Sequence, residues 1–328
     1  MNMRILIVIP AFAIRQSGNS VTARRWRSLL QALGHRVTID TAYTSQPCDV
    51  LIALHARRSA RSVLRYRQQF PAKPLILAMT GTDLYRDLER SEAAQRSMQL
   101  ASRIVLLQLD GLACLPKPQA HKARVVYQSA IPPRSGGQPL QRVFEVCVVG
   151  HLRSVKDPFR AAMAARRLPA GSRIRILHLG RSLQASLQRR ALAEMDRNPR
   201  YRWLGERSWS QTRQHIARAR LVVVSSKMEG GANVVSESLV AETPLLASRV
   251  SGNVGLLGKD YPGYFPVGDT QALADLMLRA ETDAEFYRSL REHCAARKHL
   301  VQPEKEKRDW DELLGEFLWE ACGSRGST

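Results

Sequence analysis

Residues 225–238 read Ser225-Ser226-Lys227-Met228-Glu229-Gly230-Gly231-Ala232-Asn233-Val234-Val235-Ser236-Glu237-Ser238, directly after the apolar run Leu221–Val224. This order predicts a strand, a glycine-rich turn and a helix. Glu229 lies in the turn and Glu237 one turn into the helix. Between them, the backbone N–H groups of Ala232, Asn233 and Val234 would face a ligand, because the first N–H groups of a helix have no partner within it.

A ligand with phosphates and many hydroxyls suits such a segment. The first turn of a helix favours phosphate through its donors and its dipole. A carboxylate accepts two hydrogen bonds and can hold neighbouring hydroxyls of ribose or a hexose. The segment therefore predicts a nucleotide-sugar site, with Gly230 and Gly231 in the turn. The alternative is an ordinary strand–turn–helix unit with solvated glutamates.

Short apolar runs alternate with amphipathic segments along the rest of the chain, which predicts parallel sheets covered by helices. The predicted strands are 4–10, 36–40, 50–55, 75–80, 104–108, 144–149, 173–179, 201–204, 221–224 and 244–248. Helices are predicted at 20–33 and 57–70, with Ser20 and Ser59 as N-caps and Gly34 as a stop. The turn-forming run 132–139 divides the chain into two units, and ligands of such sheets bind at the carboxyl ends of strands.

Composition limits the class of protein. The chain has 328 residues, 44% of them hydrophobic, which suffices for two cores. Its five cysteines include no C-x-x-C pair, so we expect a cytoplasmic protein without a disulfide framework or zinc site. No apolar run approaches the ~20 residues of a spanning helix. The net charge of +21 invites a nucleic-acid hypothesis, but the arginines are dispersed and aromatics are only 6%.

A second motif, Val149-Gly150-His151-Leu152-Arg153-Ser154-Val155-Lys156-Asp157-Pro158, follows the predicted strand 144–149. Lys156 and Arg153 are candidate cations for the phosphates of the predicted nucleotide sugar. Gly150 and His151 begin the same loop. The alternative is a turn with exposed cations.

Three loops of the first half would meet at one sheet edge. Gly18 and Asn19 follow the first strand, His55, Arg57 and Arg58 the third, and Thr82 and Asp83 the fourth. Arginine forks match the geometry of phosphate, so this set of residues, here called the acceptor rim, predicts a site for a small oxyanion. Asp83 and His55 are base candidates if the acceptor is instead a hydroxyl. His178 is expected to be a buried core histidine.

The segment around Glu229 and Glu237 resembles the E-x7-E motif of GT-B glycosyltransferases of the glycosyltransferase-4 type. Ser238 and Glu242 depart from that pattern, where Ala and Gly are usual. Lys156 matches the lysine of the family's G-R-L-x-x-x-K-G element, while His151 replaces its arginine and Asp157 its second glycine. The match implies that Lys156, with Arg153, stabilises the charge that develops on the departing diphosphate of a sugar donor. It also implies that Gly150 and His151 contact this donor. The resemblance implies an α/β fold of two Rossmann-like domains with parallel sheets facing across a cleft.

It further implies an acceptor-binding domain at 1–135, a nucleotide-sugar-binding domain at 140–300 and a final helix, 301–328, that packs back on the first domain. Glu229 would orient the hexose and Glu237 the ribose. No D-x-D occurs in a suitable loop of the sequence, so no metal or other cofactor is expected. Trp310, Leu313, Leu314, Phe317 and Leu318 share one face of the final helix, which favours core packing over a membrane or partner surface.

Segments 17–26, 53–59 and 152–158 resemble the selenosugar synthases of selenoneine biosynthesis. That resemblance implies transfer of a hexose from UDP-glucose or UDP-N-acetylglucosamine to selenophosphate, which forms an anomeric C–Se bond. A GT-B O-glycosyltransferase acting on an envelope glycan or lipid hydroxyl is the alternative, with Trp26 and its basic helix near anionic lipid. A nucleotide-binding module without turnover is a second. We expect neither nucleic-acid partners nor stable membrane insertion.

Overall fold

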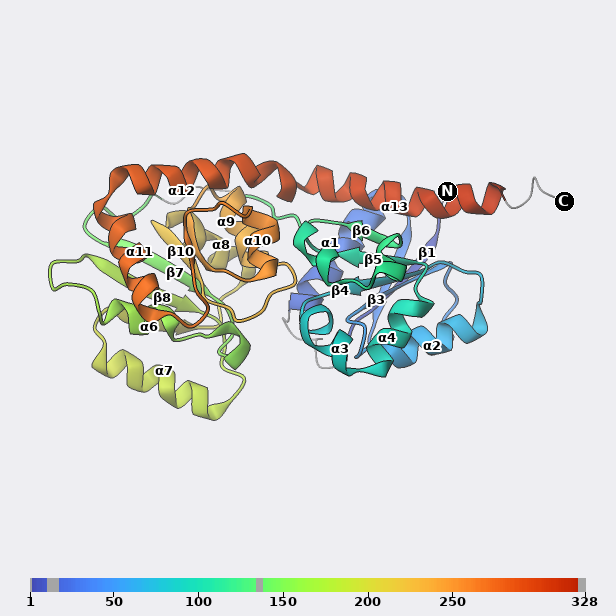
Figure 1. Cartoon of the computed structure of the whole chain (residues 1–328), viewed down its shortest axis with the longest axis horizontal. Coiled ribbons are helices and arrows are strands. Elements are labelled where there is room, and N and C mark those ends of the chain that lie inside the picture. Colours follow the sequence, from blue (N-terminus) through green and yellow to red (C-terminus); the bar gives the residue numbers. More distant parts are fainter. Residues whose placement is uncertain (1, 11–17, 134–137, 324–328) are drawn as a thin grey trace. The chain divides into compact units, whose positions relative to one another are not determined.

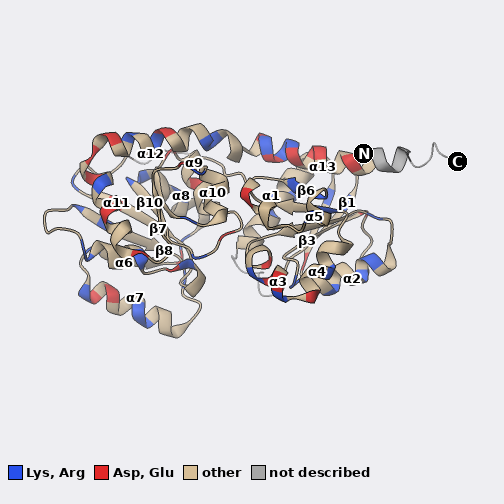
Figure 2. Cartoon of the chain, viewed as in Figure 1, with Lys and Arg blue, Asp and Glu red and all other residues tan. Residues whose placement is uncertain are grey.

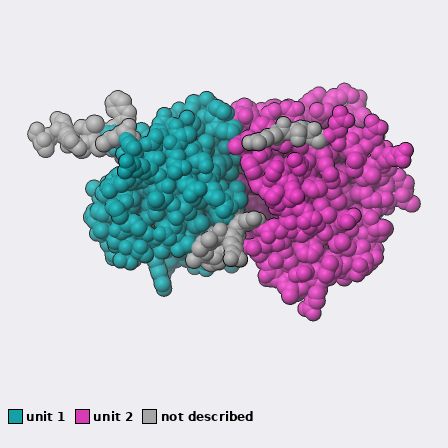
Figure 3. All heavy atoms as spheres, turned by 180° about the vertical axis from the view of Figure 1, so that it is seen from behind, with its two compact units in different colours: residues 1–129, 303–328 teal, residues 130–302 magenta. Residues whose placement is uncertain are grey.

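The chain forms two compact units (Figure 3). The computed structural model describes residues 2–10, 18–133 and 138–323, with side chains up to residue 318. Unit 1 comprises residues 1–129 and 303–328, and unit 2 comprises residues 130–302. Part of the predicted linker, residues 134–137, lies outside the described residues, as do residues 16 and 17 of the first loop.

Unit 1 contains a six-stranded parallel sheet in the order β2-β1-β3-β4-β5-β6 (Figure 1). Its strands are β1 (Arg4–Val8), β2 (Arg36–Asp40), β3 (Val50–Leu54), β4 (Leu75–Met79), β5 (Arg103–Leu106) and β6 (Ala123–Val125). Its helices are α1 (Gly18–Ala32), α2 (Ala60–Gln69), α3 (Leu88–Arg90), α4 (Glu92–Leu100), α5 (Lys117–Ala120) and α13 (Pro303–Gly323). Apolar side chains are buried on both faces of the sheet, as parallel sheets require.

Unit 2 repeats this architecture in the strand order β12-β11-β10-β7-β8-β9. Its strands are β7 (Phe144–Val149), β8 (Ile174–Leu179), β9 (Tyr201–Gly205), β10 (Leu221–Val224), β11 (Leu245–Ser248) and β12 (Tyr264–Phe265). Its helices are α6 (Arg160–Ala165), α7 (Ala185–Arg197), α8 (Trp209–Arg218), α9 (Asn233–Val240), α10 (Ser251–Leu257), α11 (Thr270–Thr282) and α12 (Ala284–Arg297). The predicted fold of two parallel α/β sheets is confirmed.

Two helix starts differ from the prediction. Ser20 lies inside α1 rather than at its cap. The helix predicted from residue 57 begins only at Ala60. Ser59 is its N-cap residue, as expected, but its hydroxyl donates to the Leu54 carbonyl at 2.7 Å and makes no capping hydrogen bond. Gly34 does follow the end of α1, with a φ of +89° that suits glycine.

The final helix, α13, belongs to the core of unit 1. Trp310, Leu313, Leu314 and Phe317 are buried in the cluster that also contains Trp26, and the rings of Trp26 and Trp310 pack edge to face with centroids 4.8 Å apart. The core-packing interpretation of this helix is confirmed, whereas a lipid contact by Trp26 is wrong because its side chain is fully buried.

A buried carboxylate fixes this packing. Glu306 of α13 accepts hydrogen bonds from the Trp26 ring N–H at 2.7 Å and from the Ser129 backbone N–H at 2.8 Å. Arg25 lies 3.0 Å from the same carboxylate. These partners compensate the cost of burying the charge. Among the described residues, no helix is long and apolar enough to cross a membrane.

Candidate active site

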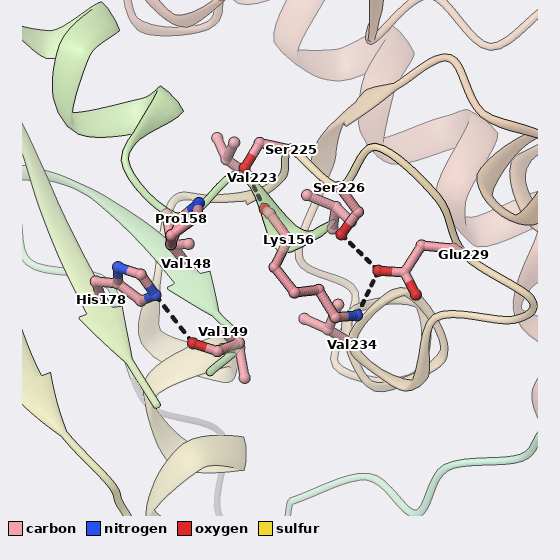
Figure 4. A pocket seen from close by; sticks show the side chains of 12 residues that line it. Val148, Val149, Lys156, Pro158, His178, Val223, Ser225, Ser226, Glu229 and Val234 are labelled. Atoms are coloured by element: carbon pink, nitrogen blue, oxygen red, sulfur yellow. Dashed lines mark hydrogen bonds and ion pairs between the residues drawn. The ribbon is translucent and has the colours of Figure 1, made fainter. Parts of the chain in front are cut away.

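The two predicted donor segments meet at the carboxyl edge of the sheet in unit 2. Strands β7 and β10 are adjacent and parallel, so the loop after β7 lies beside the turn after β10. Side chains and backbone from both loops line one small pocket. Its lining includes Gly150 and also Lys156, Ser226, Glu229 and Val234, which Figure 4 labels. This is the edge at which open parallel sheets bind ligands.

Lys156 and Glu229 form an ion pair in this pocket. The Lys156 Nζ lies 2.5 Å from Glu229 Oε1, and the hydroxyl of Ser226 donates to the same oxygen at 2.5 Å (Figure 4). Glu229 is 9% exposed, while the Lys156 side chain keeps 31% of its surface exposed. The pocket therefore holds a cation and a carboxylate that already contact each other.

The backbone holds the Lys156 loop against the β10 turn. A short 3-10 turn, Ser154–Lys156, ends at Asp157, which has a φ of +44°. The Ser225 hydroxyl donates to the Asp157 carbonyl at 2.9 Å, and the Lys227 N–H donates to the Val155 carbonyl at 2.8 Å. The aspartate that replaces the family's glycine thus adopts the left-handed conformation that glycine favours.

The backbone of the Glu229 turn packs against the start of α10. A Cβ built on Gly252 would lie 2.1 Å from the Glu229 carbonyl oxygen, so only glycine fits there. The Ser248 hydroxyl donates to the Ser226 carbonyl at 2.5 Å, and the Asn253 amide donates to the Ser248 carbonyl at 2.9 Å. The position of Glu229 is therefore fixed through several buried contacts.

Helix α9 begins where the sequence places it. Its N-cap is Ala232, whose methyl side chain has no acceptor for the first N–H groups. Asn233 is the first helical residue, Val234 lines the pocket, and Glu237 is half-buried in the next turn. Gly230 is buried and Gly231 half-buried in the turn.

His178 supports the Gly150 end of the pocket. Its ring bonds the Gly150 carbonyl through Nε2 and the Tyr201 hydroxyl through Nδ1, both at 3.0 Å. Burial lowers the pKa of His178 to about 4, so the ring is neutral near pH 7. The prediction of a satisfied core histidine is confirmed.

The other two residues of the Lys156 loop differ in exposure. His151 is half-buried, and its Nδ1 accepts the Arg181 backbone N–H at 3.2 Å. Arg153 is exposed. Their contacts with a donor remain predictions.

In unit 1, the loops after β3 and β4 come together as expected. His55 Nε2 lies 3.1 Å from the Thr82 hydroxyl, and Arg57 Nε lies 2.9 Å from Asp87 Oδ2. His55 is 2% exposed with a φ of +75°, and burial lowers its pKa. Non-glycine residues in this conformation are rare and occur often at functional sites.

The prediction that Asp83 contacts the acceptor or acts as a base is wrong. It is fully buried, and its carboxylate accepts the backbone N–H groups of Thr80, Gly81 and Ala56 at 2.8–3.0 Å. It therefore shapes the two loops and presents no open oxygen to an acceptor or a proton. Arg57 and Arg58 are exposed, as is Gly18, and Asn19 is half-buried at the start of α1.

Ser226, Gly252 and Asp87 shape the two sites and were not predicted from the sequence. Ser226 stands three residues before Glu229, a spacing that brings a turn hydroxyl close to the carboxylate. Nothing local marks Gly252, whose contact is with Glu229, or the pairing of Asp87 with Arg57, because these partners lie more than 20 positions away. Within the described part of the chain, no group of three His, Cys, Asp or Glu side chains is arranged to hold a metal ion.

Comparison with known proteins identifies the chemistry of unit 2. Residues 138–298 match the family model of glycosyl transferases group 1. The chain is a glycosyltransferase. Its two parallel sheets give it the GT-B fold, and the pocket with Lys156 and Glu229 lies inside the segment that matches the family.

Solved structures with the fold of this glycosyltransferase extend over both units. Sucrose-phosphate synthase from Thermosynechococcus elongatus is 16% identical, with a TM-score of 0.79 over 98% of this chain and 100% of its own. Anabaena HepE, solved with UDP and glucose, is 15% identical, with a TM-score of 0.74 over 96% and 100%. The pneumococcal O-GlcNAc transferase GtfA, solved with UDP and GlcNAc, is 15% identical, with a TM-score of 0.63 over 89% and 60%.

Proposed function

We propose that this glycosyltransferase transfers a hexose from UDP-glucose or UDP-N-acetylglucosamine to selenophosphate. The C1–O bond to the diphosphate breaks and its electron pair leaves with UDP, while a selenium lone pair forms the C1–Se bond. The observation that carries the donor half is the juxtaposition of Lys156, Glu229 and the start of α9 in one pocket.

Each donor residue has a distinct part in this proposal. Lys156, with Arg153, stabilises the charge that grows on the leaving diphosphate, and the first N–H groups of α9 bind phosphate oxygen. Glu229 holds hexose hydroxyls and Glu237 those of the ribose. HepE solved with UDP-glucose and GtfA solved with UDP and GlcNAc have this fold, which supports a UDP-sugar donor. The proposal needs no metal ion.

The acceptor half rests on the acceptor rim of unit 1. Arg57 and Arg58 are exposed beside the strained His55, and Arg57 keeps 44% of its side chain exposed despite its pairing with Asp87. Two exposed guanidinium groups suit a small doubly charged oxyanion. Gly18, Asn19 and Thr82 would complete the rim.

The buried state of Asp83 favours an acceptor that needs no strong base. A hydroxyl acceptor must lose its proton, but Asp83 is saturated by backbone donors and His55 is 2% exposed. A selenium nucleophile is already anionic near neutral pH. The enzyme would then act by positioning and electrostatic stabilisation.

The proposal is tested by incubating the protein with selenophosphate and either UDP-hexose, with products identified by mass spectrometry. UDP and a product that carries an anomeric C–Se bond are expected. Selective glycosylation of a lipid or sugar hydroxyl, with selenophosphate ignored, would replace the acceptor assignment by an O-glycosyltransferase. UDP binding without any turnover, hydrolysis included, would indicate a non-catalytic module.

The acceptor rim has its own test. Replacing Arg57 and Arg58 by Ala should abolish selenosugar formation and leave UDP affinity unchanged, because the donor residues lie in unit 2. The matched control is Arg61→Ala with Arg65→Ala, which removes two exposed arginines from the same region of unit 1. Acceptor binding should also weaken as salt increases, because charges that remain partly solvated are screened. Equal activity of the two double variants would contradict the assignment.

A further inference from the structure

Of the residues that line the donor pocket, Lys156 and Glu229 carry charge, and they bind each other. Both Lys156 Nζ and the Ser226 hydroxyl contact the same oxygen, Oε1, of Glu229. The proposed donor roles require Lys156 to leave Glu229 for a diphosphate, and hexose hydroxyls to take its place at the Glu229 carboxylate. A complete donor supplies a new partner to each member of the pair.

UDP alone supplies only one of these partners. Its phosphates can bind the Lys156 ammonium group. However, UDP has no hexose whose hydroxyls could replace the lysine at the Glu229 carboxylate. The carboxylate, which is 9% exposed, would keep the Ser226 hydroxyl and lose its charged partner. A poorly solvated charge without a counter-charge is costly.

We propose that the Lys156–Glu229 ion pair makes the pocket discriminate between the nucleotide sugar and the UDP product. This inference rests on the proposed donor function. When the nucleotide sugar binds, Lys156 and Glu229 lose each other and each gains a new partner. When UDP binds, the pair is also broken, but only Lys156 gains a new partner. After transfer the pair re-forms and promotes the release of UDP.

Ser226 is the positioning residue in this scheme. Its bond to Oε1 keeps the carboxylate in place when Lys156 leaves. Its own carbonyl is held by Ser248, which in turn is bound by Asn253. Glu229 therefore stays directed at the pocket, and Lys156, on the longer and more exposed side chain, is the partner that moves.

The test is calorimetry of UDP with four proteins: the wild type, Glu229→Gln, Lys156→Ala and the double variant. Glu229→Gln releases Lys156, so UDP should bind roughly five- to tenfold more tightly, the size expected for an ion pair that is partly exposed. In the Lys156→Ala background the same change should bring no gain. Affinity for a non-reactive fluorinated UDP-hexose should not rise with that for UDP, because the hexose loses its carboxylate.

Two outcomes would overturn the inference. An unchanged UDP affinity in Glu229→Gln would mean that the pair does not oppose UDP. An equal gain with and without Lys156 would mean that any lost negative charge favours UDP. The control for that general effect is Glu206→Gln, an exposed carboxylate that follows β9 at the same sheet edge, for which no gain is expected.

Failure of the donor function itself would look different. A wild-type protein that binds neither UDP nor the UDP-hexose would refute the proposed function and this inference together. UDP binding that responds to Glu237→Ala but not to Glu229→Gln would refute this inference and leave the donor site in place.

Discussion

At the scale of single residues, buried His178 makes the stability of the protein depend on pH. Burial lowers the pKa of His178 to about 4, whereas the unfolded chain has an ordinary histidine near 6.5. Between pH 6.5 and about 4, the unfolded state therefore binds a proton that the folded state does not. The free energy of unfolding falls as the pH drops through this range, and the loss is complete below about pH 4.

We expect this one group to contribute roughly 3 kcal/mol to the loss of stability between pH 7 and 4. The measurement is thermal unfolding of the wild type and His178→Gln across this range. The variant should be less stable at pH 7, because it loses ring hydrogen bonds to Gly150 and Tyr201, but its stability should depend less on pH. Parallel pH profiles of the two proteins would contradict the buried neutral state.

Lys156 acts on a charge that grows during the reaction. Lys156→Ala should therefore lower kcat roughly 10²- to 10³-fold while donor affinity changes much less. Steady-state kinetics together with calorimetry of the UDP-hexose separate the two effects. A raised KM with an unchanged kcat would instead place Lys156 in uniform binding.

At the scale of elements, helix α10 supports the Glu229 turn through a backbone contact. A methyl group at Gly252 would lie 2.1 Å from the Glu229 carbonyl oxygen, so one of the two must move. We expect Gly252→Ala to cost about 1–3 kcal/mol of stability and to displace the carboxylate. Turnover of the UDP-hexose should drop in a protein that remains folded at 25 °C.

Gly171→Ala is the matched control for this prediction. Gly171 lies in the same unit, and nothing stands within 4 Å of a Cβ at that position. It should keep wild-type kinetics. Normal turnover in both glycine variants would show that the Glu229 turn tolerates displacement.

At the scale of the whole molecule, unit 1 is made from both ends of the chain. Helix α13 contributes four buried apolar side chains and Glu306 to a core whose other members lie in residues 1–129. Truncating a buried Trp, Phe or Leu costs about 2–5 kcal/mol each, and a domain has only about 5–15 kcal/mol in total.

A chain that ends at residue 302 should therefore lose the fold of unit 1 and keep that of unit 2. Hydrogen exchange resolved by peptide would show it as lost protection over residues 1–129, with protection retained in the strands β7 to β12. Retained protection in unit 1 would mean that α13 is dispensable.

The positive charge of the chain is distributed over both units. Figure 2 shows Lys and Arg on elements of each of them.

The local elements and much of the donor motif can be predicted from the order of the residues. Strands β2, β7 and β10 begin and end at the residues that the sequence predicts for them. Turn and helix around Glu229 and Glu237 follow from two glycines and an apolar repeat, and the apolar face of residues 310–318 predicts its own burial. Strands β6 and β12, with three and two residues, are too short to produce such a period.

The tertiary structure alone decided which of these residues meet. Lys156 and Glu229 are 73 positions apart and pair because β7 and β10 are neighbours in the sheet. Asp83 looked available in the sequence, but the Ala56 N–H, 27 positions away, helps to saturate it. Trp26 is buried against Trp310 in the core, and Glu306, 280 positions away, accepts its ring N–H. The apolar periodicity of a segment predicts which of its faces is buried. It does not predict which distant segment covers that face.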